Sequence, residues 1–497
     1  MPRLRQAQHN RAGGQSWPSF DERQSTPLFL GRQQYRKLVV LLDADVLQEL
    51  DMSTWNKEYL LGGLLTLDAI ECLRYADEGP PDDVPRHENR FMGEVVPGWA
   101  VLSPDDGSGY RSARTATGDL IGDHTVFGNA PDVAEHDTRT PAYSELAPAD
   151  AAAQRRADVL SAMVATAIRA DLFITRRAYL HAMSWNAADG VTFTDIDDAL
   201  AVIGLYLRAQ NQYVTSRNPQ GGVSFNMNRG LFFWVGTREL LPSAWRWLSA
   251  LVQHSTGGGD DRLLYLGQSV LQRVERALQV RDEVHVALNK PQNNDTADDA
   301  LSSLDVVLLL LMGAVDATAR VTHSVLGLTS RAYLVGWQRN DWNTAVTAVA
   351  PQLWAIFQPG TDEVHALTIL RLLRNSIHGE ALQAVGVGQG RRRDRTLVNL
   401  PASEEPALRA AFVALGGLAD WGVEELIPGR LHFDPGVLLE QLFPRVLDML
   451  NKIMDETPVE TLAHVTLQPS DSLPPTGPHS GPFLELNRHS IRWQLGF

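Results

Sequence analysis

The stretch LVVLLDADVLQEL, residues 38–50, begins with an apolar run that ends in two aspartates, Asp43 and Asp45, and then turns apolar again. A short apolar run of this kind is typical of a buried strand in a parallel sheet. Carboxylates are rarely buried without a partner or a metal ion. Because ligands of open α/β sheets lie beyond the carboxyl ends of the strands, the two aspartates indicate a candidate site there.

Strands and helices alternate on both sides of a long polar segment. Residues 37–76 indicate a strand followed by a helix, and residues 151–210 indicate a helix, two strands and a further helix. This alternation predicts a parallel sheet in which 38–43 and 171–175 are neighbouring strands. The segment between them is rich in Pro, Gly and Asp, and we expect an insertion with short strands.

Beyond Gln210 the strand pattern fades and apolar residues recur at helical spacing. The predicted fold class is α/β plus all-α, a parallel-sheet domain with a long insertion followed by a helical bundle. The predicted organisation is a flexible basic N-terminus at 1–36, an α/β domain at 37–210 with its insertion at 77–150, a helical connecting region at 211–298, a helical domain at 299–455 and a Pro/Ser-rich tail at 456–497.

Composition excludes several classes of protein. The net charge of −15 argues against a protein that coats nucleic acid non-specifically. The single cysteine, Cys72, excludes an intramolecular disulfide and a cysteine-rich zinc site. The longest apolar run, 306–315, is too short to span a bilayer, and the N-terminus lacks the apolar core of a secretory signal. We therefore expect a cytoplasmic protein with no membrane partner.

Five acids are candidates for a metal site at the end of the sheet. Asp43 and Asp45 follow the first strand, Asp158 is expected to open a helix, and Asp68 and Glu71 are expected three residues apart on one helical face. Gathered carboxylates repel one another unless a divalent cation joins them, and Mg²⁺ and Mn²⁺ suit oxygen ligands. Such a site can hold a phosphodiester and activate water for its hydrolysis.

The order of these pieces resembles the PIN-domain nucleases. The resemblance rests on Leu42-Asp43-Ala44-Asp45-Val46, on ADVLSAMVATAI around Asp158, and on the closing segments ADLFITRR and GVTFTDIDDALAVI. It covers residues 37–76 and 151–210, and it implies a metal-dependent nuclease with Mg²⁺ or Mn²⁺. Where that family often carries Asp or Asn after the threonine, this chain has Arg176 and Arg177. These arginines either weaken metal binding or grip phosphate.

Two other interpretations of the acids remain open. Aspartates near strand ends and helix starts are often turn, cap or first-turn residues without a ligand. Asp43-Ala44-Asp45 also has the double-aspartate form of the haloacid-dehalogenase-type phosphatases, and GDLIGD at 118–123 matches their later acidic motif.

A second constellation lies in LRLLRNSIHGEAL, residues 370–382, where Arg371, Arg374, Asn375 and His378 share one helical face. Arginine beside histidine can hold a phosphate and move a proton near neutral pH, which suffices for metal-free RNA cleavage. The alternative is that Arg and His complement the dipole at a helix C-terminus, or form a plain interface.

This segment resembles the HEPN family of helical ribonucleases over roughly residues 299–455. Arg374-Asn375 supplies the arginine–polar pair, and Asp305, Asp316 and Arg320 on an earlier helix are candidate polar partners. The resemblance implies RNA cleavage without a cofactor and a homodimer through the C-terminal domain. The loop GVGQGRRRDRT at 386–396 offers Arg391, Arg392 and Arg393 as phosphate contacts.

Two functions follow from these patterns. The first is a ribonuclease of toxin or antiviral-defence type that cleaves RNA and works with an antitoxin or defence-system partner. The second is a catalytically inactive binding or sensing protein that dimerises and recognises nucleotide or nucleic acid. Acids clustered within metal-ligand reach would favour the first function, whereas arginine or lysine side chains that neutralise those acids would favour the second.

Overall fold

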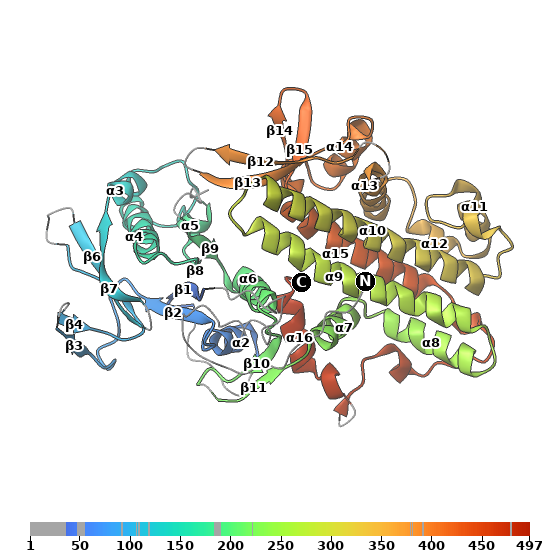
Figure 1. Ribbon diagram of the computed structural model, residues 1–497, viewed down its shortest axis with the longest axis horizontal. Helices are drawn as coiled ribbons and strands as arrows, with labels where there is room; N and C mark the ends of the chain where they lie inside the picture. Colours follow the sequence, from blue (N-terminus) through green and yellow to red (C-terminus); the bar gives the residue numbers. More distant parts are fainter. Residues whose placement is uncertain are drawn as a thin grey trace, which may run out of the picture.

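The computed structural model describes residues 36–46, 55–90, 93–105, 107, 110–117, 120–182, 190–220, 222–377, 379, 381–389, 392–477 and 480–497. Over these ranges the chain is mixed α/β, with a parallel sheet in its N-terminal half and a largely helical C-terminal half (Figure 1). These features of the expected fold class are confirmed. The expected flexible N-terminus lies outside the described residues apart from Arg36.

The central sheet has the strand order β2-β1-β8-β9, and every pair in it is parallel. Val40 and Leu42 of β1 pair with Leu172 and Ile174 of β8, so the predicted adjacency of these two strands is confirmed. The strands are β1 (Leu38–Asp43), β2 (Ile70–Tyr75), β8 (Leu172–Ile174) and β9 (Thr192–Thr194).

Helices cover both faces of this sheet. Val40 and Leu42 pack on one face with α2 (Lys57–Leu64) and α6 (Ile196–Ala209). Leu41 packs on the other face with α4 (Pro148–Ala167), and α5 (Ala178–Ala182) follows β8. Since β1 is covered on both faces, its side chains are apolar without alternation, as in other buried parallel strands.

The segment 59–76, expected to be one helix, is a helix and then a strand. Helix α2 ends at Leu64, where Thr66 donates from its backbone and its hydroxyl to the carbonyl of Gly63. Strand β2 then runs beside β1. Asp68 therefore lies in a turn and Glu71 on a strand, so the expected shared helical face is wrong. A short apolar segment fits both periods, and pairing with β1 decides the outcome.

The insertion at 77–150 contains the expected short strands. Its three-stranded antiparallel sheet, β5-β6-β7, has α4 packed against β7, and β3 and β4 form a separate hairpin (Figure 1). The elements are β3 (His87–Asn89), β4 (Gly93–Val95), β5 (Ala100–Leu102), β6 (Tyr110–Thr117), β7 (Leu120–Phe127) and α3 (Ala130–Glu135).

One buried apolar cluster runs from Tyr213 to Leu495 and joins the segments expected as a connecting region, a helical domain and a tail. Its long helices α9, α10 and α15 lie side by side (Figure 1). The elements are β10 (Val214–Arg217), β11 (Ser224–Asn226), α7 (Arg229–Leu240), α8 (Ala244–Thr256), α9 (Asp261–Leu288), α10 (Asn294–Val325), α11 (Asn340–Val349), α12 (Pro351–Ala355), α13 (Asp362–Ser376), α14 (Glu405–Ala414) and α15 (Pro435–Glu456).

The C-terminal half also contains a sheet, which departs from the expected all-α domain. Its strand order is β12-β13-β15-β14, and its strands are β12 (Ala384–Gln389), β13 (Arg392–Asn399), β14 (Val423–Ile427) and β15 (Arg430–Phe433). The expected loop at 386–396 is therefore largely a β-hairpin. The β12 and β13 residues pair in antiparallel register, and the consecutive residues Thr396, Leu397 and Val398 of β13 are all buried, so pairing and packing both stabilise this segment.

The expected tail contains a packed helix. Helix α16 (Glu485–Gln494) buries Ile491 against α7, and its end is held by Arg208, which donates to the carbonyl of Gln494 at 2.8 Å. Gln494 in turn donates to the carbonyl of Val214 at 2.9 Å. These bonds anchor the C-terminus between α6, α7 and β10, which local Pro and Ser content does not reveal.

Helix α10 contains the apolar run 306–315, expected to be too short to span a bilayer, but the whole helix is long and apolar enough to cross a membrane by length and composition. Half of its apolar window is buried inside the structure, where it packs against α9, α13 and α15. The core helix of a soluble protein meets the same criteria, so α10 is compatible with a soluble protein.

Candidate functional site

Asp43 lies at the carboxyl end of β1 and is 2% exposed. The parallel register places the residue after β8, Thr175, next to it, and the Thr175 hydroxyl donates to Asp43 Oδ2 at 2.5 Å. Thr175 is itself fully buried. Asp43 is therefore a buried carboxylate with an oriented partner, as the opening motif predicts.

Asp158 reaches the same site from α4 and is fully buried. Its Oδ2 accepts a hydrogen bond from the Tyr143 hydroxyl at 2.6 Å, and its Oδ1 lies 3.4 Å from Gln154 Nε2. The expectation that Asp158 opens a helix is wrong. Helix α4 begins at Pro148, because proline suits the first helical position and its missing N–H has no partner to lose there.

Arg177 lies between these acids, with its side chain only 10% exposed. Its Nε and Nη2 donate to the two oxygens of Asp43 at 2.7 and 3.1 Å. Its Nη1 lies 3.0 Å from Asp77 Oδ2 and 3.4 Å from Asp158 Oδ1. The predicted meeting of Asp43 and Asp158 at one edge is thus confirmed, with one guanidinium between them.

The electrostatics match this arrangement. Burial tends to lower the pKa of Arg177, but its hydrogen bonds and attraction to Asp43 and Asp77 raise that pKa well above the usual value, so Arg177 stays charged. Burial raises the pKa of Asp158, against the opposing influence of Tyr143 and Arg177. Partial desolvation and the neighbouring charge of Asp43 raise the pKa of Asp45, although this residue is exposed.

These residues do not fit the predicted Mg²⁺ or Mn²⁺. A divalent cation needs several carboxylate oxygens turned toward it, and here both oxygens of Asp43 accept from Arg177. The guanidinium also places a positive charge where a cation would be repelled. Among the described residues, no three side chains of His, Cys, Asp or Glu converge as a metal-binding group.

The other predicted ligands do not join this cluster. Asp45 is exposed on the turn after β1, and Asp68 is exposed on the turn before β2. Glu71 pairs with Val39 in the register, four residues before Asp43, which puts it about 13 Å along the strand from Asp43. There it binds Lys37, with Nζ and Oε2 3.1 Å apart.

The two arginines predicted as phosphate contacts differ in their surroundings. Arg177 is committed to the three acids, whereas Arg176 is exposed and places Nη2 3.3 Å from the carbonyl of Val46. In the hairpin β12–β13, Arg392 and Arg393 lie on β13, and Arg391 lies outside the described residues. The hairpin arginines keep their predicted role as a hypothesis.

The second constellation lies on α13, while His378 lies outside the described residues. Arg371 and Arg374 are partly buried, and Arg374 Nη1 donates to Asn375 Oδ1 at 3.2 Å. Arg374 Nε is buried without a hydrogen-bond partner in the described part of the chain. Among the described residues, the guanidinium of Arg374 therefore has only some of its hydrogen-bond donors paired.

Asp316 of α10 is the acid that faces this cation. Burial raises its pKa, and a hydrogen bond with Gln338 and the charges of Arg374, Arg320 and Arg273 act in the opposite direction. The predicted partner Asp316 thus lies within electrostatic reach of Arg374, and the predicted Arg320 lies within electrostatic reach of Asp316. The third, Asp305, has a pKa raised by burial alone and a buried Oδ1 without a partner among the described atoms.

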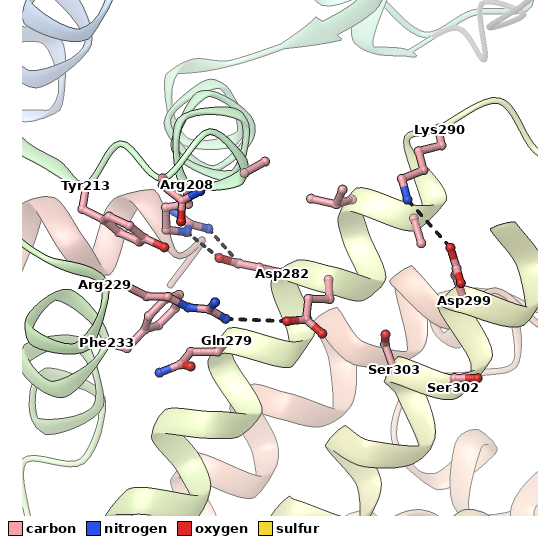
Figure 2. Close-up of a pocket in the computed structure, with 15 residues that line it drawn as sticks. Arg208, Tyr213, Arg229, Phe233, Gln279, Asp282, Lys290, Asp299, Ser302 and Ser303 are labelled. Carbon is pink, nitrogen blue, oxygen red and sulfur yellow. Dashed lines mark hydrogen bonds and ion pairs between the residues drawn. The ribbon is translucent and has the colours of Figure 1, made fainter. Parts of the chain in front are cut away.

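The structure also reveals a cavity that no motif indicates. It holds about 410 Å³ and lies between the end of α6, the start of α7 and the helices α9 and α10 (Figure 2). Three ion pairs line it, with separations of 2.6 Å for Arg208–Asp282, 3.6 Å for Arg229–Glu283 and 3.8 Å for Lys290–Asp299. Each cation faces an acid, so the cavity has little charge left for a ligand. Two of the three pairs, Arg208–Asp282 and Arg229–Glu283, join segments that are far apart in the sequence, so no local pattern indicates the cavity.

No protein-family model, no curated protein and no solved structure matches this chain. The resemblances to the PIN-domain and HEPN families therefore stay predictions from the sequence.

Proposed function

We propose that this chain is a cytoplasmic binding or sensing protein that recognises RNA or a nucleotide and does not hydrolyse phosphodiesters at its N-terminal sheet edge. The PIN-like half supplies the scaffold, and the HEPN-like half supplies the arginine-bearing surfaces of α13 and the hairpin β12–β13. Such a protein works through what it binds and through its partners, which include an antitoxin or another defence-system component.

One observation carries this proposal. Arg177 bridges Asp43, Asp77 and Asp158, so a guanidinium holds the position in which a metal-dependent nuclease needs a divalent cation. Guanidinium cannot lower the pKa of a bound water as a metal ion does, and it has no open coordination position. A carboxylate cluster neutralised in this way favours the binding function over hydrolysis.

The test is incubation of the purified protein with a labelled mixed RNA pool in Mg²⁺, in Mn²⁺ and in EDTA. We expect RNA to be bound, with affinity that falls as salt rises, and to stay whole in all three conditions. Metal-dependent cleavage that disappears in Asp43→Asn and persists in Asp150→Asn, an exposed acid at the start of α4, would overturn the proposal.

A second candidate is metal-free RNA cleavage at α13, in a ribonuclease of toxin or antiviral-defence type. It is supported by the partly satisfied Arg374 beside Asp316. In this function Arg374 and Arg371 bind the phosphate and His378 moves the proton. Cleavage should then survive EDTA, leave 2′,3′-cyclic phosphate ends and be lost in His378→Ala, with Asp43→Asn unchanged. Intact RNA in EDTA, with partners present, removes this candidate.

The same half of the chain is the proposed site of homodimer formation. A two-fold interface through the C-terminal domain should bury well over about 1,000 Å². Analytical ultracentrifugation at micromolar concentration should give the mass of a dimer, and a monomer throughout that range would contradict this part of the proposal.

A further inference from the structure

A second cavity, of about 620 Å³, lies at the amino end of the central sheet, opposite the cluster around Arg177. Its walls come from the start of β1, from the C-terminal end of α4 and from β7 of the insertion. Arg36, Arg169 and His124 line it together with Thr125, and Val39 and Leu120 provide an apolar wall. The volume suits a small-molecule ligand.

The charge of this cavity is positive. No carboxylate is among the described residues that line it. Arg36 binds Asp171, which lies outside the cavity wall and also accepts from the backbone N–H of Val39 at 2.9 Å. The side chain of Arg169 has no ion-pair partner in the part of the chain that the structure describes. Within the described residues, one full positive charge is therefore left for a ligand.

The backbone of Arg169 supports a role beyond packing. Arg169 follows α4 with φ at 57°, in the left-handed region, and Ala170 N–H bonds the carbonyl of Ala165 at 2.9 Å to close the helix. Helices that end in this way strongly favour glycine at such a position. An arginine held in an unfavourable backbone conformation is an outlier from which a functional hypothesis can be drawn.

His124 adds a polar group from the insertion. It lies on the inner side of β7, where its Nε2 is 3.2 Å from the Thr115 hydroxyl. Burial lowers the pKa of His124, nearby Arg169 lowers it further, and Asp123 opposes both. An anion next to both side chains would favour the protonated, doubly donating form of His124.

We propose that this cavity binds the phosphate group of a ligand of nucleotide size, with Arg169 as the cation and with Arg36 and His124 as further hydrogen-bond donors. The apolar wall of Val39 and Leu120 accepts a flat ring beside the phosphate. The insertion at 77–150 then has a defined role, because β7 closes one side of the site. The inference does not depend on the proposed function, since phosphate binding is measured without RNA.

Isothermal titration calorimetry with a 5′-mononucleotide, its unphosphorylated nucleoside and inorganic pyrophosphate tests the site in the full chain. We expect the mononucleotide and pyrophosphate to bind, and the nucleoside to bind at least about tenfold more weakly, because charge-assisted hydrogen bonds are the strong ones. Equal affinity for nucleotide and nucleoside, or no binding at millimolar concentration, overturns the proposal.

Variants at Arg169 separate binding from folding. Arg169→Gly and Arg169→Asn remove the charge and suit the left-handed backbone, so both should fold as well as the wild type and bind at least about tenfold more weakly. Arg169→Lys keeps the charge and should stay within a few-fold of the wild type, as should the control Arg262→Ala on the exposed start of α9. Unchanged affinity in Arg169→Gly overturns the assignment.

A further comparison distinguishes two sources of the bound phosphate, an RNA end and a free nucleotide. A short oligoribonucleotide with a 5′-phosphate is compared with its 5′-hydroxyl form and with the mononucleotide. Tighter binding of the phosphorylated oligonucleotide assigns the site to an RNA end, and tighter binding of the mononucleotide assigns it to a free nucleotide. Equal binding of the two oligonucleotides, with no effect of Arg169→Gly, contradicts both.

Discussion

The two ends of the central sheet use arginine in opposite ways. At the carboxyl end, Arg177 is 10% exposed and its charge is taken up by Asp43, Asp77 and Asp158. At the amino end, the side chain of Arg36 is 70% exposed and binds Asp171, whereas Arg169 has no ion-pair partner among the described residues and faces a cavity lined by no described carboxylate. The carboxyl end satisfies its charges internally, whereas the amino end keeps positive charge for a ligand.

This difference teaches that acids at strand ends do not by themselves indicate a metal site. A buried carboxylate needs a cation, but the chain can supply that cation itself. Arg177, which follows β8, is therefore the residue that decides between the two functions, and its position matters as much as that of the acids.

The largest expected effect comes from Arg177→Ala. Removing the guanidinium leaves Asp43 and Asp158 buried without their cation, and breaking a buried pair in this way costs about 3–5 kcal/mol of unfolding free energy. Urea unfolding followed by circular dichroism measures the loss. Asp43→Asn in the Arg177→Ala background should recover part of it, because one uncompensated charge is gone. A loss below about 1 kcal/mol would mean that the cluster is not held by Arg177.

A smaller effect is expected from Thr175→Val, which removes the hydroxyl that donates to Asp43. A hydrogen bond to a charged group contributes about 1.5–3 kcal/mol, so the unfolding free energy should fall by that amount. The matched control is Thr194→Val at the end of β9, whose buried Oγ1 has no hydrogen-bond partner in the described structure. The control should be neutral or stabilising, and equal losses in both variants would contradict the role given to Thr175.

Two carboxylates on this side of the sheet should respond to pH with opposite sign. Hydrogen bonds from Thr140, and then from the Arg139 backbone, lower the pKa of Asp137 from 3.8 to about 2, so the stability it contributes is present above pH 3.8 and is lost as pH falls through about 2. Burial raises the pKa of Asp158, so protonation of this carboxylate favours the folded state. The unfolding free energy that it contributes therefore rises as pH falls through the raised pKa.

Denaturant unfolding of Asp137→Asn and Asp158→Asn across this pH range checks the signs. On acidification, the unfolding free energy of the wild type minus that of Asp137→Asn should fall. The unfolding free energy of the wild type minus that of Asp158→Asn should rise. Parallel curves for both variants would show that neither carboxylate has a shifted pKa in the folded protein.

The smallest effect, and of opposite sign, is expected at the amino end. Arg169→Gly places glycine at a left-handed position and should leave the unfolding free energy unchanged or raise it by up to about 1 kcal/mol. Thermal melting monitored by fluorescence measures this. A loss as large as that of Arg177→Ala would show that Arg169 is structural, and the contrast between the two ends of the sheet would disappear.

The sequence was informative where one local pattern sufficed. The apolar run before Asp43 and the run before Thr175 predicted neighbouring parallel strands, and the structure confirms them. The helix assigned to Asp68 and Glu71 failed because a short apolar segment satisfies both the helical and the strand period, and only pairing with β1 selects the strand.

Long-range contacts account for the rest. The bonds from Arg177 to Asp43 and Asp77 span 134 and 100 residues, so no local window contains them. Helix α16 is polar by composition, and its place depends on Arg208, 286 residues before Gln494. The basic cavity likewise joins α4, β1 and the insertion, which lie together only in the folded chain.

The most direct test of the account is a Mn²⁺ titration of the wild type, Arg177→Gln and the double variant Arg177→Gln/Asp43→Asn, followed by electron paramagnetic resonance. Because Arg177 fills the cation position, we predict that the wild type binds no Mn²⁺ at this edge, and that Arg177→Gln, which frees three carboxylates, gains one Mn²⁺ that the double variant loses. Stoichiometric Mn²⁺ binding by the wild type that Asp43→Asn abolishes would contradict the account and restore the metal-dependent nuclease.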